Sequence, residues 1–201
     1  MNKFLVIAAF LTVPILSQAQ EEEFQTIFHK NTGGKIAISA FGGPFMQFTS
    51  IDKDFALMIG GGGGIMLGNI FIGGYGVGKS NEIPYKSDNT NSLGFGHGGL
   101  WLGYTIFPKK SIHFSLSAQA GWGSISKKLK LPEGDYKNID SDPITIITPM
   151  IEVEFNLSRF FKIGTGASWS YVSNISNSSP YINKDFSTPS FMLSFKFGWF
   201  K

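Results

Sequence analysis

The sequence contains no cysteine among its 201 residues, so the fold depends on burial and hydrogen bonding alone. Charged residues are scarce as well, at 15%, and the formal net charge is only +3. Such a small and dispersed charge argues against a nucleic-acid partner. Past residue 20 no apolar run reaches the length of a membrane-spanning helix, which excludes a helical membrane protein. The length fits a single domain.

The first residues have the pattern of an export signal. Lys3 precedes an apolar stretch from Phe4 to Leu16, and Ser17 and Ala19 place small residues where a signal peptidase reads them. We therefore predict a signal peptide over residues 1–19 and a periplasmic segment over 20–34. The polar QEEEFQ run that follows argues against the alternative, an N-terminal membrane anchor. The lack of a cysteine after the cleavage site excludes a lipid anchor.

From residue 35 onward the dominant pattern has a period of two. In IHFSLSAQAGWGS, residues 112–124, apolar residues alternate with small or polar ones, which is typical of a strand with one apolar face. Recurrence of this pattern predicts eight strands, over 35–50, 55–67, 70–78, 94–106, 112–124, 144–157, 161–172 and 189–200. Short turns are expected at 68–69, 107–111 and 158–160, and long polar loops at 79–93, 125–143 and 173–188. The short connection at 51–54 is the exception among the long ones.

The first three strands can be placed in register. A turn at Asp52-Lys53 pairs Phe48 with Leu57 and Met46 with Ile59, and a turn at Gly68-Asn69 pairs Leu67 with Ile70. Both pairings keep aliphatic residues on one face, which a slip of one residue would destroy.

The apolar face is expected to contact lipid. The strands are long enough to cross a bilayer with tilt, and one edge has short turns while the other has long loops. Aromatic residues gather at both ends of the apolar faces, as in interfacial girdles: Trp122, Trp169 and Tyr171 toward the long loops, and Phe155, Phe161 and Trp199 toward the short turns. Trp101 falls on the opposite face. We predict an all-β fold, an eight-stranded antiparallel up-and-down transmembrane β-barrel over 35–201.

Two stretches carry a resemblance to a known group of proteins. The final segment FMLSFKFGWFK resembles the C-terminal strand of bacterial outer-membrane proteins, although Lys201 stands where an aromatic residue is usual. GGPFMQFTSI with GGGGGIMLGNIFIGGYG, and later IEVEFNLSRFFKIGTGASW, are similar to small outer-membrane β-barrels of Bacteroidota. The resemblance implies the barrel fold and the bacterial outer membrane as location, and it implies no catalytic residues.

Residues Gly73 to Ser80, GGYGVGKS, match the nucleotide-binding P-loop pattern. A working P-loop needs a following helix whose N-terminal amides hold phosphate. Here NEIPYKSDNTNS follows, with Pro84 and many turn formers, so no helix is expected. We interpret the match as a coincidence and expect no nucleotide. The glycines instead leave room inside a narrow barrel, for Phe41, Phe71 and Tyr75.

Charged residues on the inner faces suggest a network in the lumen. Glu152 and Glu154 lie two apart on one strand, with Lys162 diagonal to Glu154 and Lys196 two strands away; Lys35 lies on the strand that closes against the last one. Buried charges need partners, so we expect a neutralised ion network that plugs the barrel. The alternative is a gate whose rearrangement opens a small pore.

The histidines form no catalytic or metal site. Pairing across the 107–111 turn sets His113 near Thr105, which leaves His97 about 25 Å away along the neighbouring strand. We predict a non-enzymatic outer-membrane protein, structural or engaged in surface interactions, with no cofactor or metal and a lumen filled by polar side chains. Its expected partners are outer-membrane lipid and the barrel-assembly machinery; the surface ligand stays open. Alternatives are a narrow gated channel or carrier, a lipid-modifying enzyme, for which no catalytic cluster is found, and a secreted soluble β-barrel that binds a ligand.

Overall fold

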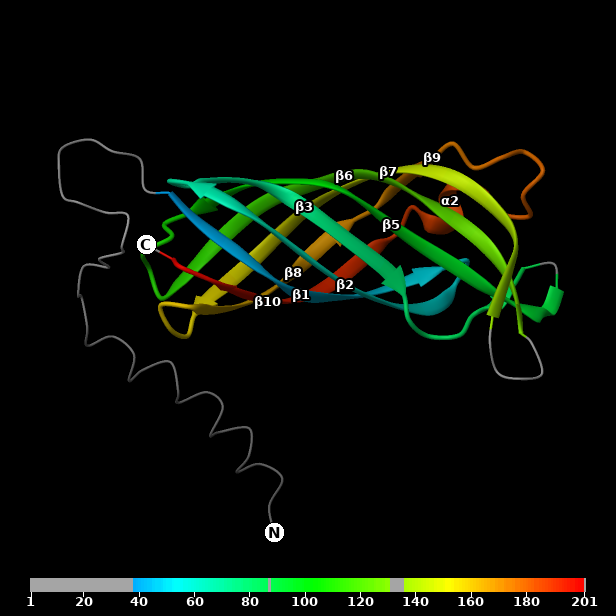
Figure 1. Cartoon of the computed structure of the whole chain (residues 1–201), viewed down its shortest axis with the longest axis horizontal. Helices are drawn as coiled ribbons and strands as arrows, with labels where there is room; N and C mark the ends of the chain where they lie inside the picture. Colours follow the sequence, from blue (N-terminus) through cyan, green and yellow to red (C-terminus); the bar gives the residue numbers. More distant parts are fainter. Residues whose placement is uncertain (1–37, 87, 131–135, 201) are drawn as a thin grey trace, which may run out of the picture.

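The chain forms a closed ring of antiparallel strands (Figure 1). The computed structural model describes residues 38–86, 88–130 and 136–200. The ring consists of β1 (Ile38–Ile51), β2 (Asp54–Leu67), β3 (Ile70–Lys79), β5 (Asp88–Ile106), β6 (Ile112–Lys130), β7 (Tyr136–Asn156), β8 (Phe161–Trp169) and β10 (Pro189–Gly198). Consecutive ring strands pair with each other, and β10 returns to β1 to close the sheet. The eight predicted strands are thus confirmed.

Three short elements lie at one end of the ring. β4 (Pro84–Tyr85) pairs with β5, β9 (Tyr171–Ser173) continues the line of β8 along β7, and α2 (Asn183–Phe186) is a single turn before β10. We call this the long-loop end and the opposite one the short-turn end. In the described ranges no helix has the length and apolar character needed to cross a bilayer. The predicted signal peptide (1–19), the segment 20–34 and Lys35 lie outside the described residues.

The predicted register of the first hairpins is confirmed. Phe48 pairs with Leu57, Met46 with Ile59 and Leu67 with Ile70. Asp52 and Lys53 both have positive φ, at 47° and 75°, as a type I′ turn requires. Gly68 has φ of 62°, which fits the first central position of a type II′ turn.

Three predicted details are wrong. The expected loop at 79–93 contains β4 and the first residues of β5, which begins at Asp88. The expected loop at 125–143 is mostly strand, since β6 and β7 stay paired as far as Lys130 and Tyr136. These extensions are mostly exposed and polar, so they lack the apolar alternation that marks the other strands. The 107–111 connection also pairs Thr105 with Ser115 instead of His113. That shift leaves both faces unchanged, because it moves the pairing by an even number of residues.

The lumen is less polar than predicted. Two buried apolar clusters fill much of it, one around Phe45, Phe71 and Trp101, and one toward the long-loop end around Ile125 and Ile146. Polar side chains occupy the rest, including fully buried Gln119, Ser115 and Thr148. The outer face is apolar and exposed: Ile65, Ile72, Leu100, Leu102, Phe114, Leu116, Ile147, Ile151, Phe191 and Phe197.

The glycines of β2 and β3 make room for the inner rings. Gly64 pairs with Gly73, Gly63 with Gly74 and Gly61 with Gly76. A Cβ at Gly62 would lie 3.0 Å from the Trp101 ring. Phe41, Phe71 and Trp101 pack edge to face there, with ring centroids 5.2–5.8 Å apart, so the predicted use of the freed volume is confirmed. The P-loop-like residues Gly73 to Lys79 lie along β3 as an extended strand.

Candidate functional site in the barrel lumen

Four of the five charged residues singled out in the sequence meet inside the barrel near its short-turn end. Glu152 and Glu154 lie two apart on β7 and therefore share the inner face. Lys162 on β8 pairs directly with Lys196 on β10. All four are buried, with exposed fractions of 0–4%. The fifth, Lys35, lies outside the described residues.

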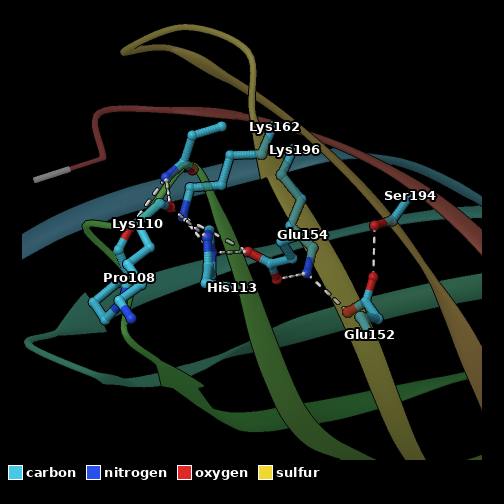
Figure 2. A network of polar contacts seen from close by, with 9 residues as sticks. Pro108, Lys110, His113, Glu152, Glu154, Lys162, Ser194 and Lys196 are labelled. Carbon is cyan, nitrogen blue, oxygen red and sulfur yellow. Dashed lines mark hydrogen bonds and ion pairs between the residues drawn. The ribbon is translucent and has the colours of Figure 1, made fainter. Parts of the chain in front are cut away.

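Lys196 joins the two carboxylates (Figure 2). Its Nζ donates to Glu152 Oε2 at 2.9 Å and to Glu154 Oε1 at 2.7 Å. Lys162 Nζ lies 3.6 Å from Glu154 Oε2. Two carboxylates thus face two ammonium groups, so the charge of the buried group is balanced.

Two further residues complete the group, and sequence analysis did not include them. His113 Nε2 lies 2.9 Å from Glu154 Oε2, and Ser194 Oγ donates to Glu152 Oε1 at 2.6 Å. His113 stands directly across from Glu154 in the β6–β7 pairing. This register would have revealed the contact between His113 and Glu154. The register could not be deduced from the sequence, because the expected connection between the two strands is long and its length does not determine how they pair. We call these six residues the lumen network: His113, Glu152, Glu154, Lys162, Ser194 and Lys196.

The lumen network is anchored to the turn between β5 and β6. His113 Nδ1 lies 3.2 Å from the Lys110 carbonyl oxygen, and Asn156 Nδ2 donates to the same oxygen at 2.8 Å. Lys162 Nζ also lies 3.4 Å from His113 Nε2, so the imidazole stands between the Lys110 carbonyl, the Glu154 carboxylate and an ammonium group. The contacts tie strands β6, β7, β8 and β10 together from within (Figure 2).

Aromatic faces complete the surroundings of the two lysines. Lys162 Nζ lies 4.1 Å from the centroid of Phe200, and Lys196 Nζ lies 5.3 Å from that of Trp101, within range of cation–π attraction. A glycine makes the space: a Cβ at Gly164 would lie 2.7 Å from Glu152 Oε1.

The arrangement suits bracing and occlusion better than catalysis. The cavity beside the network measures about 10 Å³, room for about one water molecule. His97 takes no part, because its Nδ1 faces the Tyr75 hydroxyl at 3.1 Å and it pairs with Gly123, ten residues along β6 from His113. Within the described ranges no three His, Asp or Glu side chains are grouped to hold a metal.

The predicted girdle residues lie on the outer face. Trp122 is 70% exposed. The others are exposed or half-buried: Trp169, Tyr171, Trp199, Phe155 and Phe161. Trp101, in contrast, is 2% exposed and faces the lumen, as its place in the alternation indicates. The interfacial role of the outward residues stays a prediction.

The comparisons with known proteins agree on the fold. No protein-family model matches the chain, and no curated protein matches its sequence. Neisserial surface protein A (NspA) superposes with a TM-score of 0.55 at 9% identity, over 82% of this chain and 97% of that one. This chain has the fold of the eight-stranded outer-membrane β-barrels.

A second solved structure supports that assignment. Ail, the attachment invasion locus protein of Yersinia pestis, superposes with a TM-score of 0.50 at 12% identity, over 83% of this chain and all of that one. The predicted fold class and the resemblance to small outer-membrane barrels are therefore confirmed. The narrower resemblance to proteins of Bacteroidota stays a prediction.

Proposed function

We propose that the protein is a non-enzymatic component of the bacterial outer membrane, exported by a cleaved signal peptide, with a structural or surface-interaction role. The apolar outer face supports this proposal, because exposed residues such as Leu100 and Phe191 form a continuous surface that water would disfavour and lipid would accept. Its partners are then outer-membrane lipid and the barrel-assembly machinery. The long-loop end would face the cell exterior.

The observation that carries the proposal is the occluded lumen. The lumen network fills the short-turn end, and the two apolar clusters fill the barrel above it. An ion crossing this interior would have to displace Trp101 and Phe45 and break the contacts of Glu154. Such a barrel serves as a scaffold for its loops and not as a general diffusion pore.

Single-channel recording in planar bilayers tests this function. The purified chain should first show the shift between boiled and unboiled samples in gel electrophoresis that marks a closed barrel. The wild type should then give no conductance steps, because its lumen is filled. Reproducible steps that change in the Glu154→Ala variant would replace the proposal with the narrow gated channel. A soluble chain without a gel shift would favour the soluble ligand-binding barrel.

A further inference from the structure

A second hollow lies at the long-loop end, far from the lumen network. It has a volume of about 230 Å³ and is bounded by three connections: the β1–β2 turn, the β3–β5 segment and the loop before β10. Ile51, Ile83 and Leu93 form an apolar floor. We call this hollow the mouth pocket. It lies apart from the lumen network, and the proposed function assigns it no ligand.

Two tyrosines form one wall of the mouth pocket. The rings of Tyr85 and Tyr181 meet edge to face, with centroids 5.3 Å apart. The Lys86 backbone N–H donates to the Tyr181 hydroxyl at 2.8 Å, and Phe186 packs against the Tyr181 ring at 5.4 Å. Because these contacts hold both rings in place, the wall is preorganised for a ligand.

The rim of the mouth pocket is charged, with acids in excess. Lys86 Nζ joins Asp52 at 3.2 Å and Asp185 at 3.0 Å, which ties the three connections together. Asp54 also lines the pocket and is exposed. Its side chain forms no hydrogen bond or ion pair with any other residue in the part of the chain that the structure describes. Its carboxylate therefore has full capacity to accept hydrogen bonds from a ligand.

We propose that the mouth pocket binds a neutral hydroxylated ring, such as one sugar residue of a surface glycan. Ring C–H groups would lie against the tyrosine wall and the apolar floor, and ring hydroxyls would donate to Asp54. The excess of carboxylates disfavours anions, and the volume lies below that of sites for drug-sized ligands. The expectation that a ligand reaches the mouth pocket from the cell exterior rests on the proposed function, whereas the chemistry of the pocket does not.

The test uses the full chain, refolded in a detergent without a sugar headgroup and titrated with a panel of neutral methyl monosaccharides by calorimetry and ligand-observed NMR. At least one sugar should bind, with a dissociation constant on the order of millimolar for so small a ligand. Asp54→Ala should weaken binding about tenfold, since it removes a charged acceptor. Lys109→Ala, which changes an exposed charged side chain at the short-turn end, outside the pocket lining, should bind as the wild type does.

A second variant tests the aromatic wall. Tyr85→Leu keeps an apolar side chain but removes the flat ring, so it should also weaken sugar binding while the heat-dependent gel shift persists. Failure of every sugar to bind overturns the proposal, as does equal binding by wild type and Asp54→Ala. Tighter binding of a small organic amine or of a sulfated sugar overturns the neutral-ring assignment. None of these results depends on conductance, so a failure here is distinct from a failure of the proposed function.

Discussion

Replacing Glu154 by alanine removes the residue that makes the most contacts within the lumen network. Its carboxylate lies 2.9 Å from His113, 2.7 Å from Lys196 and 3.6 Å from Lys162. After the substitution Lys196, 4% exposed, keeps its contact with Glu152, whereas Lys162, 1% exposed, loses its ion pair with Glu154. Breaking a buried ion pair by removing one partner costs about 3–5 kcal/mol, and we expect a loss of that size in the free energy of unfolding.

Urea unfolding in phospholipid vesicles, followed by tryptophan fluorescence, measures this loss. The double variant Glu154→Ala with Lys162→Met should lose less free energy of unfolding than the sum of the losses of the two single variants. The difference should reach up to about 3 kcal/mol, because the second change removes a buried charge that the first leaves without its carboxylate. Asp140→Ala serves as a surface control and should stay within about 0.5 kcal/mol of the wild type. A loss below about 1 kcal/mol for Glu154→Ala would refute the reasoning, since it would mean that water replaces the carboxylate and the lumen is hydrated.

Three further predictions concern other parts of the barrel. Gly73→Ala should lower the free energy of unfolding by about 1–3 kcal/mol in the same assay, because its Cβ would lie 2.0 Å from a backbone oxygen. Gly76→Ala, whose Cβ would have nothing within 4 Å, should be neutral or slightly stabilising. Equal effects of the two substitutions would contradict this interpretation of the glycines. In single-tryptophan variants, brominated lipids should quench the fluorescence of Trp122, which is 70% exposed, and leave that of Trp101, which is 2% exposed, unchanged. The reverse result would mean that the face assigned to the lumen contacts lipid. Burial raises the pKa of Tyr181 from 10.0 to about 12, so its neutral form stabilises the loops fully below pH 10 and loses that effect as the pH rises toward 12. In near-ultraviolet titrations, the difference between wild type and Tyr181→Phe should show one tyrosine that ionises late; a difference with its midpoint near pH 10 would contradict this prediction.

The sequence was most informative where turns are short. The two-residue turns at 52–53 and 68–69 leave one register that keeps aliphatic residues together, and the structure has that register. The longer 107–111 connection permits more than one register with the same faces, and there the prediction was wrong by two residues. Period-two alternation fixes which face a residue occupies, and it fixes the pairing only when the turn adds its own constraint.

The lumen depends on contacts that alternation does not encode. Trp101 was placed on the inner face, but its packing with Phe41 and Phe71 depends on ring closure between β3 and β5. The contact of His113 with Glu154 depends on the β6–β7 register. The outer parts of β6 and β7 carry no apolar stripe; in the proposed membrane orientation they would project beyond the bilayer and would have no apolar surface to match.

The ring has one pairing unlike the rest. Seven of its eight pairings join ring strands that follow one another along the chain. The eighth joins the first strand to the last, β1 to β10, and pairs residues 41–48 with residues 191–198. Local hairpins form readily, but closing so long a loop is entropically costly, and we expect it to come last. Until then the sheet has two long free edges, each able to pair with another chain. The folding chain must therefore be protected at those edges up to its final step, although the finished barrel shows no trace of them.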